Sequence, residues 1–251
     1  MFDHRGYIDV IASESARLVT ALEAGGDRPI PWSDSWKVQD CAQHLGAVHW
    51  VVTKVITGRA TTTFDAFAEL DIPDATDPGL GEWVANGTSG LVGALGSVEP
   101  GEPTWSWWPD GQRAGFWSRR MAQETLVHRW DTERGAGVAM APMDPALAAD
   151  GVDEYLEIFV PRVRARLSSP GAGETAHLHC TDTDGEWLVT FPAPGVSEVR
   201  REHAKGDVAF RGPAEGLLLH VWGRVDAADA GVDVIGDDGL VGRWRELVPA
   251  I

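Results

Sequence analysis

The spacing of apolar residues changes between residues 140 and 150, and this change limits the folds that the chain can adopt. Before it, apolar residues recur every three to four positions over long stretches, as the buried face of an amphipathic helix requires. After it come short alternating runs separated by turns, which are typical of strands. The sequence therefore predicts an α+β fold in two domains, a helical bundle over 1–145 and a smaller α+β domain over 146–251.

Four helices are expected in the N-terminal domain, which is the number that a bundle needs. Their expected extents are Ile8 to Leu22 before Gly25 and Gly26, Trp36 to Thr57 with Ser35 as its cap, Leu80 to Leu95, and Ala114 to Arg134, which ends at Gly135. Between the second and third helices, residues 61–79 predict a loop with one helical turn.

In the C-terminal domain, Pro145 is expected to begin a helix that Pro161 kinks or breaks. Two alternating runs around Asp184-Gly185 predict a β-hairpin. A further strand is expected to precede a helix with Pro213 in its first turn.

Charge and cysteine content exclude several functions. The 38 Asp and Glu outnumber the 21 Lys and Arg, so the net charge is −17 and neither nucleic acid nor an anionic membrane surface is an expected partner. The two cysteines, Cys41 and Cys180, do not make a disulfide framework. Since we find neither a signal peptide nor a run of about 18 apolar residues, we expect a cytoplasmic protein.

Glu124 and His128 are the residues that most directly indicate chemistry. They stand four apart in one helix, so both side chains lie on one face. His44, in a second helix, can complete three sides of a cation site and leave one position open, as catalytic zinc sites do. Asp131 continues the stripe and could orient a ligand or move a proton. An ordinary surface pair for Glu124 and His128, and an ion pair with a neighbouring arginine for Asp131, are the alternatives.

The third ligand has two competitors. His49 is rotated about 140° from His44 on an ideal helix, so the two cannot easily reach one metal. Cys41 precedes His44 by three residues and could add a thiolate, but we favour His44 alone, with Cys41 as buried packing. A carboxylate and two imidazoles form a zinc-type ligand set that also suits iron, nickel or manganese.

Three residues lie outside this cluster. Arg224, at the end of a predicted helix, could hold an anion, although a cation at a helix C-terminus is favourable by itself. His177 and His179 alternate on a strand and face one side, which could bind a metal. With no acidic partner at a fitting spacing, we interpret that pair as an ordinary surface strand.

Two motifs resemble a known family. W-x-V-x-D-x-x-x-H-L-G (Trp36 to Gly46) together with F-W-x-R-R-x-x-x-E-x-x-x-H-R-W-D-x-E (Phe116 to Glu133) looks like the mycothiol-dependent maleylpyruvate isomerase family, which belongs to the DinB-like metal-binding four-helix bundles. The later segment Arg211 to Arg224 resembles the sterol-carrier-like C-terminal domain of that family.

The resemblance implies a role for each matching residue. It assigns His44, Glu124 and His128 as metal ligands, places Asp131 beside the metal as a catalytic or orienting carboxylate, and has Arg224 reach the site to bind cofactor or substrate.

It also implies the chemistry and the setting. Zinc would activate the thiol of mycothiol, an actinobacterial cofactor, for addition to a maleylpyruvate-like double bond, rotation and elimination. The alternatives are a mycothiol S-transferase acting on other electrophiles and a non-catalytic protein that binds a small ligand around a structural metal. The expected partners are a small electrophile and the thiol, in a monomer or homodimer.

Overall fold

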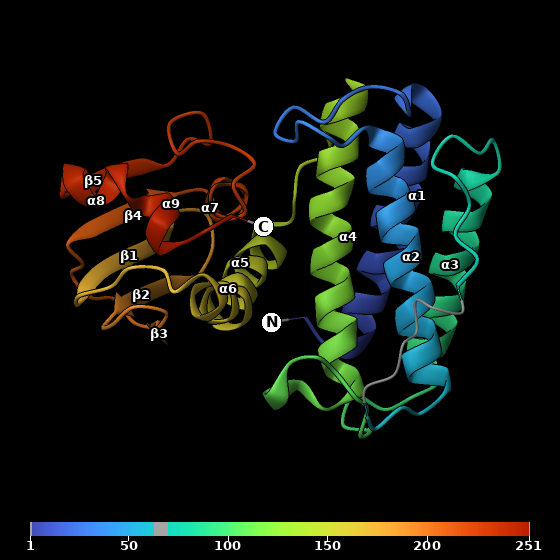
Figure 1. The fold of residues 1–251 in the computed structure, drawn as a ribbon, viewed down its shortest axis with the longest axis horizontal. Coiled ribbons are helices and arrows are strands. Elements are labelled where there is room, and N and C mark those ends of the chain that lie inside the picture. Colours follow the sequence, from blue (N-terminus) through green and yellow to red (C-terminus); the bar gives the residue numbers. More distant parts are fainter. Residues whose placement is uncertain (1, 63–69, 251) are drawn as a thin grey trace. The chain divides into compact units, whose positions relative to one another are not determined.

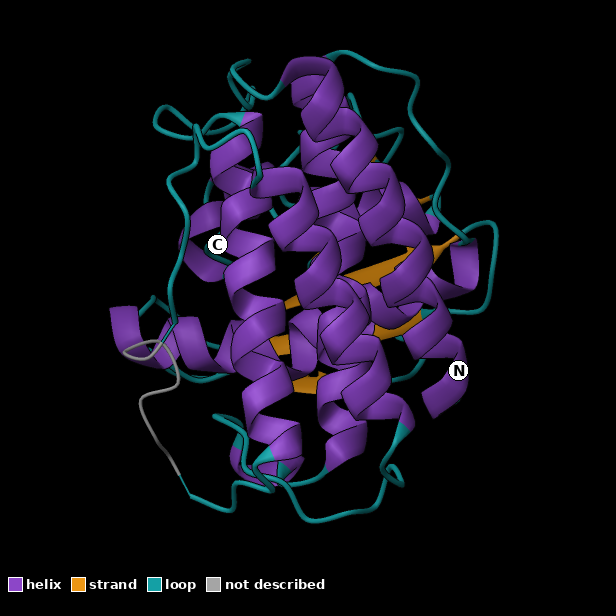
Figure 2. Cartoon of the chain, turned by 90° about the vertical axis from the view of Figure 1, so that its right-hand side faces the viewer, coloured by secondary structure: helices purple, strands orange, loops and turns teal. Residues whose placement is uncertain are grey.

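The computed structural model describes residues 2–62 and 70–250, and the chain divides after Ala141 into two compact units. Figure 1 shows the path of the chain, and Figure 2 separates its helices from the strands of the sheet. Of the loop expected over 61–79, residues 63–69 lie outside the described part. No helix within the described part is both long and apolar enough to cross a lipid bilayer.

The first unit is built from the four expected helices. They are α1 (His4–Gly25), α2 (Val38–Thr57), α3 (Leu80–Gly96) and α4 (Ala114–Ala136), with a short 3-10 turn, η1 (Pro109–Gly111), before the last. Both α1 and α2 pack against α3 and α4. This arrangement brings α2 and α4, which carry the candidate ligands, side by side (Figure 1).

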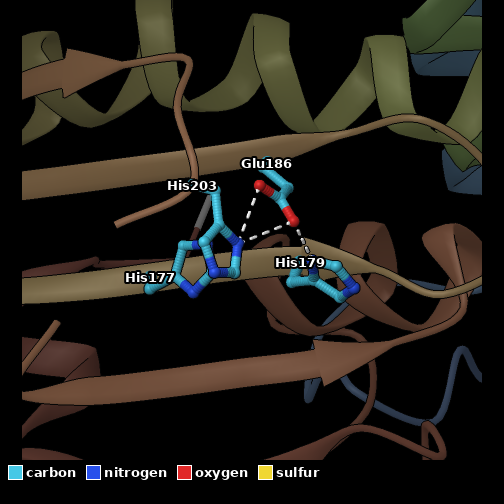
Figure 3. A group of neighbouring side chains, drawn as sticks. All are labelled: His177, His179, Glu186 and His203. Carbon is cyan, nitrogen blue, oxygen red and sulfur yellow. Dashed lines mark hydrogen bonds and ion pairs between the residues drawn. The ribbon is translucent and has the colours of Figure 1, made fainter. Parts of the chain in front are cut away.

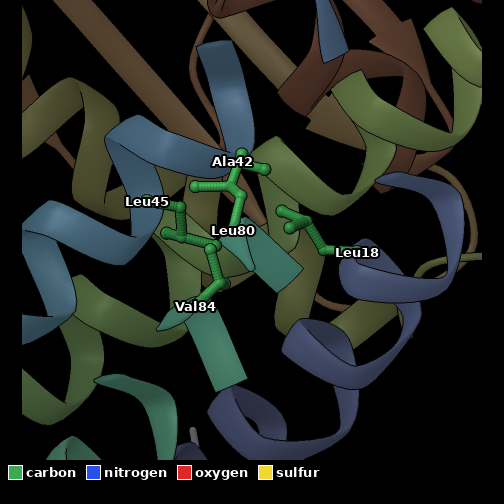
Figure 4. Close-up of a cluster of buried hydrophobic side chains, with 5 residues drawn as sticks. All are labelled: Leu18, Ala42, Leu45, Leu80 and Val84. Atoms are coloured by element: carbon green, nitrogen blue, oxygen red, sulfur yellow. The ribbon is translucent and has the colours of Figure 1, made fainter. Parts of the chain in front are cut away.

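Apolar side chains from three helices fill one part of the bundle core. The cluster in Figure 4 is Leu18, Ala42, Leu45, Leu80 and Val84, each at most 2% exposed. Beside it, Gly46 lets α2 approach α3 closely, since a Cβ there would lie 2.4 Å from the Trp83 ring. The glycine of the H-L-G motif therefore serves packing.

Two helix ends differ from expectation. The second helix begins at Val38 rather than Trp36, and Ser35 is not its cap, because the Trp36 carbonyl accepts from Ile30 in a short antiparallel bridge. The fourth helix runs two residues further, to Ala136. It ends there because Gly137 adopts the left-handed conformation, with φ of 68°, and turns its N–H back onto the last turn.

A buried charge network joins α1 to α4. The Arg129 guanidinium, fully buried, contacts Glu14 at 2.6 Å and Glu133 at 3.0 Å, and Arg17 contacts Glu133 at 2.7 Å. Two residues of the second family motif, Arg129 and Glu133, are thus committed to holding the bundle together.

The second unit is a five-stranded sheet with helices. Its elements are α5 (Pro145–Glu154), the π-helical turn η2 (Tyr155–Phe159), α6 (Val160–Leu167), β1 (Glu174–Cys180), β2 (Glu186–Phe191), β3 (Glu198–Arg200), β4 (Val208–Gly212), α7 (Ala214–Val221), β5 (Asp233–Gly236), α8 (Asp238–Gly242) and α9 (Trp244–Leu247). The strand order is β3-β2-β1-β4-β5, with β1 and β4 parallel and the other pairs antiparallel. The α+β class and the hairpin of β1 and β2 are confirmed.

The long helix expected from Pro145 changes its hydrogen bonding just before Pro161. Val160 donates to the carbonyl of Tyr155, five residues back, which makes one wide π-helical turn. Proline has no N–H to donate, so the turn before it must accommodate a missing bond. The predicted interruption is present, and it takes the form of this π-turn.

Candidate metal centre

The side chains of His44, Glu124 and His128 converge between α2 and α4. One oxygen of Glu124, Oε1, lies 3.2 Å from Nε2 of His44 and 3.3 Å from Nε2 of His128. One donor atom from each of the three residues lies within 4.8 Å of the others. The structure therefore brings together the three residues that the helix spacing and the family resemblance single out.

These spacings suit a tetrahedral metal. With ligand bonds of about 2.0–2.2 Å, as zinc makes to nitrogen and oxygen, neighbouring ligand atoms stand about 3.4 Å apart. The two Glu124 contacts, at 3.2 and 3.3 Å, are close to that edge length. Two imidazoles and one carboxylate occupy three corners of such a tetrahedron, so the fourth remains for another ligand.

Asp131 holds the His128 ring at Nδ1, the ring nitrogen that does not point toward Glu124. Oδ2 of Asp131 accepts a hydrogen bond from Nδ1 of His128 at 2.9 Å, and both side chains are buried. A proton kept on Nδ1 leaves the lone pair of Nε2 directed toward His44 and Glu124. A carboxylate behind a ligating imidazole is the usual support of a metal-bound histidine.

Arg120 fixes the remaining oxygen of Glu124. This arginine, 2% exposed and one helical turn before Glu124, donates from Nη2 to Oε2 at 2.9 Å. Burial alone would raise the pKa of the Glu124 carboxyl, but hydrogen bonds from His128 and His44 and the charge of Arg120 hold it well below its usual value. Glu124 is thus ionised and oriented, and sequence reasoning gave Arg120 no such role although its i−4 spacing indicated it.

The surroundings of His128 favour the protonated form of its imidazole. Burial alone would lower the pKa of its imidazole, but Cys41, Asp131 and Glu124 raise it well above the usual value. The carboxylates of Asp131 and Glu124, which favour a proton here, also favour a cation. A divalent ion would have to displace that proton, so metal affinity should fall in acid.

The two competitors for the third ligand point elsewhere. His49 is fully buried and bonds Thr88 at 3.1 Å and Thr125 at 3.0 Å, away from His44. Burial lowers the pKa of His49 to about 3, so its ring is neutral.

Cys41 lies behind the His128 ring. Its Sγ is 3.3 Å from Nδ1 of His128, the nitrogen already bonded to Asp131. Cys41, His128 and Asp131 also form a group that could hold an ion, but all three are buried. Cys41 packs with the apolar residues between α1, α2 and α4, as expected for a buried thiol.

Solvent reaches the site from the His44 side. The His44 side chain is 39% exposed and lines a pocket of about 520 Å³ with Trp36, Asp40 and Gln43 among its neighbours. The Trp36 ring lies 5.2 Å from the His44 ring and 6.2 Å from the His128 ring, centre to centre. Of the three candidate ligands, His44 therefore borders a partly aromatic pocket.

Arg224 belongs to the second unit, just beyond α7. Its Nη1 donates to the Trp222 carbonyl at 3.0 Å, and its guanidinium lies 5.5 Å from the centre of the Trp222 ring. These contacts fit a cation at a helix C-terminus. Its part in the site remains a prediction.

The structure supplies an acidic partner that the strand spacing of His177 and His179 did not show. Both face one side of β1, as expected, but Glu186 and His203 lie beside them, and the four form a group that could hold a metal ion. The missing acidic partner comes from the next strand, where Glu186 is paired directly with His179. Spacing along one strand does not reveal a partner supplied by its neighbour.

Comparison with known proteins agrees with the two-unit architecture. Residues 8–133 match the model of the mycothiol maleylpyruvate isomerase N-terminal domain, and residues 146–243 match the model of the C-terminal domain of the same isomerase. No curated protein sequence matches the chain significantly.

Two solved structures share the fold over 93% of both chains. A histidine-to-alanine mutant of the mycothiol-dependent maleylpyruvate isomerase matches with a TM-score of 0.59 at 14% identity, and another structure of the mycothiol-dependent maleylpyruvate isomerase matches with 0.56 at 15%. The two domain models together span most of the sequence and describe an isomerase, so the chain is an enzyme. It belongs to the mycothiol maleylpyruvate isomerase family.

Proposed function

We propose that this protein catalyses cis–trans isomerisation of a maleylpyruvate-like acid, with mycothiol as thiol cofactor and a divalent metal, zinc in the first instance, at His44, Glu124 and His128. The observation that carries the proposal is the convergence of three donor atoms within 4.8 Å beside a pocket lined by His44. Family membership supplies the reaction class and the thiol.

The donor set fits the proposed metal. The two imidazoles and the carboxylate leave one corner for an exogenous ligand, and His128 is oriented by Asp131 from behind. When bound, a divalent ion would lower the pKa of a coordinated thiol, which is about 8.5 when free, and so supply a thiolate at neutral pH.

The protein's own residues then have defined tasks. Arg120 and the two histidines keep Glu124 ionised and fixed. Asp131 keeps the His128 proton on Nδ1, which leaves Nε2 free to ligate. Arg224 is proposed to bind a substrate carboxylate, because a guanidinium pairs with a carboxylate through two parallel hydrogen bonds.

The test combines metal analysis with a turnover assay. Purified protein should hold a divalent metal and convert maleylpyruvate only when mycothiol is added. His44→Ala and His128→Ala should lose both the bundle metal and turnover, whereas Gln43→Ala, which changes the residue beside His44 in the same pocket, should keep the metal. Full turnover without any small thiol would refute the thiol role, and full metal occupancy in both histidine variants would refute the ligand assignment.

Product analysis separates the isomerase from an S-transferase. An isomerase returns the thiol unchanged, so the product contains no sulfur from mycothiol. A transferase leaves that sulfur bonded to carbon in the product. Mass spectrometry of the reaction mixture therefore decides between the two with one sample.

A further inference from the structure

We propose that His177, His179, Glu186 and His203 form a second divalent-metal site, of zinc type, on the sheet of the second unit. It is separate from the centre in the bundle and shares no residue with it. The site requires neither thiol nor substrate, so it does not depend on the proposed reaction.

The strand register places three of the four ligands. Side chains alternate between the faces of a strand. In β1, Leu178 and Cys180 lie on the buried face, at 0% and 4% exposure, so His177 and His179 share the other. Glu186 of β2 pairs directly with His179 in the antiparallel ladder, and its carboxylate contacts Nδ1 of that ring.

The fourth residue arrives from the segment after β3. Nδ1 of His203 lies 3.1 Å from both oxygens of Glu186, and the His203 ring meets the His177 ring edge to face, with centres 5.3 Å apart. Figure 3 shows the four side chains gathered over the sheet. Segments separated by up to 26 positions in sequence thus meet at one point.

The spacing suits one ion. One donor atom from each of the four residues lies within 4.8 Å of all the others. A tetrahedral zinc has ligand atoms about 3.4 Å apart, so shifts of about 1 Å would close the cluster around it. The contact between His203 and Glu186, at 3.1 Å, is already near that distance.

Hydrogen bonding alone does not explain why the His177 side chain is buried. The residue is only 7% exposed, and its Nε2 is buried without a hydrogen-bond partner among the described residues. A buried polar atom without a partner is costly, and native proteins seldom leave one so. Three imidazoles around one carboxylate are the donors that zinc prefers, and a bound ion would give this histidine a reason to be there.

The cluster is accessible to an ion. His203 lines two pockets, one of about 600 Å³ together with His177 and one of about 460 Å³ together with His179 and Glu186. The net charge of −17 draws cations toward the protein. Four protein ligands close the coordination sphere, which makes this a structural site that ties the segment around His203 to β1 and β2.

Zinc counting tests the proposal on the full-length protein. Metal-free protein is dialysed against Zn²⁺, and bound zinc is measured by mass spectrometry. We expect two equivalents in the natural protein and one in the double variant His179→Ala/His203→Ala. The matched control is Glu202→Ala, which removes an exposed acidic neighbour that is not a ligand and should keep both.

A second arm isolates the new site. In a His44→Ala/His128→Ala background one equivalent should remain, and Co²⁺ in its place should give the strong visible absorption of tetrahedral coordination. His203→Ala, a change at a side chain 78% exposed and therefore tolerated by the fold, should weaken this binding at least about 100-fold. Circular dichroism verifies that each variant is folded.

The outcomes separate the two sites. If zinc bound in the His44→Ala/His128→Ala background is unaffected by His203→Ala, or if no zinc binds there at all, the second site is refuted. If the bundle site alone is wrong, the His44→Ala/His128→Ala variant binds as much zinc as the natural protein, and the loss caused by His179→Ala/His203→Ala remains.

Discussion

Asp131→Asn tests how the bundle holds its metal. Asparagine has the shape of aspartate, and its amide oxygen can still accept from Nδ1 of His128, so the fold should tolerate the change. What disappears is the negative charge 2.9 Å from the imidazole. That charge strengthens His128 as a ligand, and it also favours the proton that a metal must displace.

These two effects have opposite signs, and pH separates them. Loss of a supporting residue of this kind weakens metal binding about 10–100-fold, or about 1.4–2.7 kcal/mol. Since Asp131 helps raise the pKa of His128, the variant should have a lower pKa there and suffer less competition from protons. The natural protein should therefore exceed the variant most in zinc affinity at high pH, and the difference should shrink as the pH falls.

Competition titration with a chromophoric zinc chelator measures both affinities at several pH values. The second metal site is first removed with His179→Ala/His203→Ala, so that only the bundle contributes. Asp40→Asn is the matched control, because it makes the same change at a residue lining the His44 pocket. Equal affinities for Asp131→Asn and Asp40→Asn at pH 8.5 would refute the orienting role of Asp131.

Three further predictions concern the bundle. Glu133→Gln should lower the free energy of unfolding in urea by about 2 kcal/mol, because the buried Arg129 loses one of its two carboxylate partners and keeps only Glu14; a loss below about 1 kcal/mol would contradict this. His49, whose pKa is about 3 when folded and near 6.5 when unfolded, binds its proton only in the unfolded chain between those values. Stability should therefore fall as the pH drops from 6 to 4, by up to about 1.4 kcal/mol per unit, and His49→Gln should remove that slope; identical slopes would show that this histidine does not titrate on unfolding. Cys41→Ala should leave bundle zinc unchanged in mass spectrometry, since Sγ faces the Nδ1 side of the His128 ring; loss of the metal would make Cys41 a ligand.

The bundle was readable from the sequence because its information is local. The spacing of apolar residues predicted four helices, and the i,i+4 pair of Glu124 and His128 gave two of the three candidate metal ligands. On the facing helix, only one of His44 and His49 could be a ligand, because the two side chains cannot share a helix face. The structure turns His49 toward two threonines. Helix ends were less accurate, since α4 ends where Gly137 takes a left-handed conformation, not at Gly135.

Long-range pairing explains what the sequence did not reveal. The match of His179 with Glu186 depends on the register of the hairpin, and the position of His203 depends on how the chain returns after β3. The Asp184-Gly185 turn predicted the hairpin itself, but not which residues face each other across it. The last strand, β5, has only four residues and little alternation of polar and apolar side chains, so the sequence pattern did not predict it.

X-ray absorption at the zinc edge shows whether the bundle metal has an open position that accepts the thiol. The sample is the His179→Ala/His203→Ala variant loaded with one zinc, so that only the bundle site is observed. Before thiol is added, we expect nitrogen and oxygen ligands alone; after mycothiol is added, we expect one sulfur at about 2.3 Å. Sulfur bound before addition, or none after it, would contradict an open metal corner that receives the thiol.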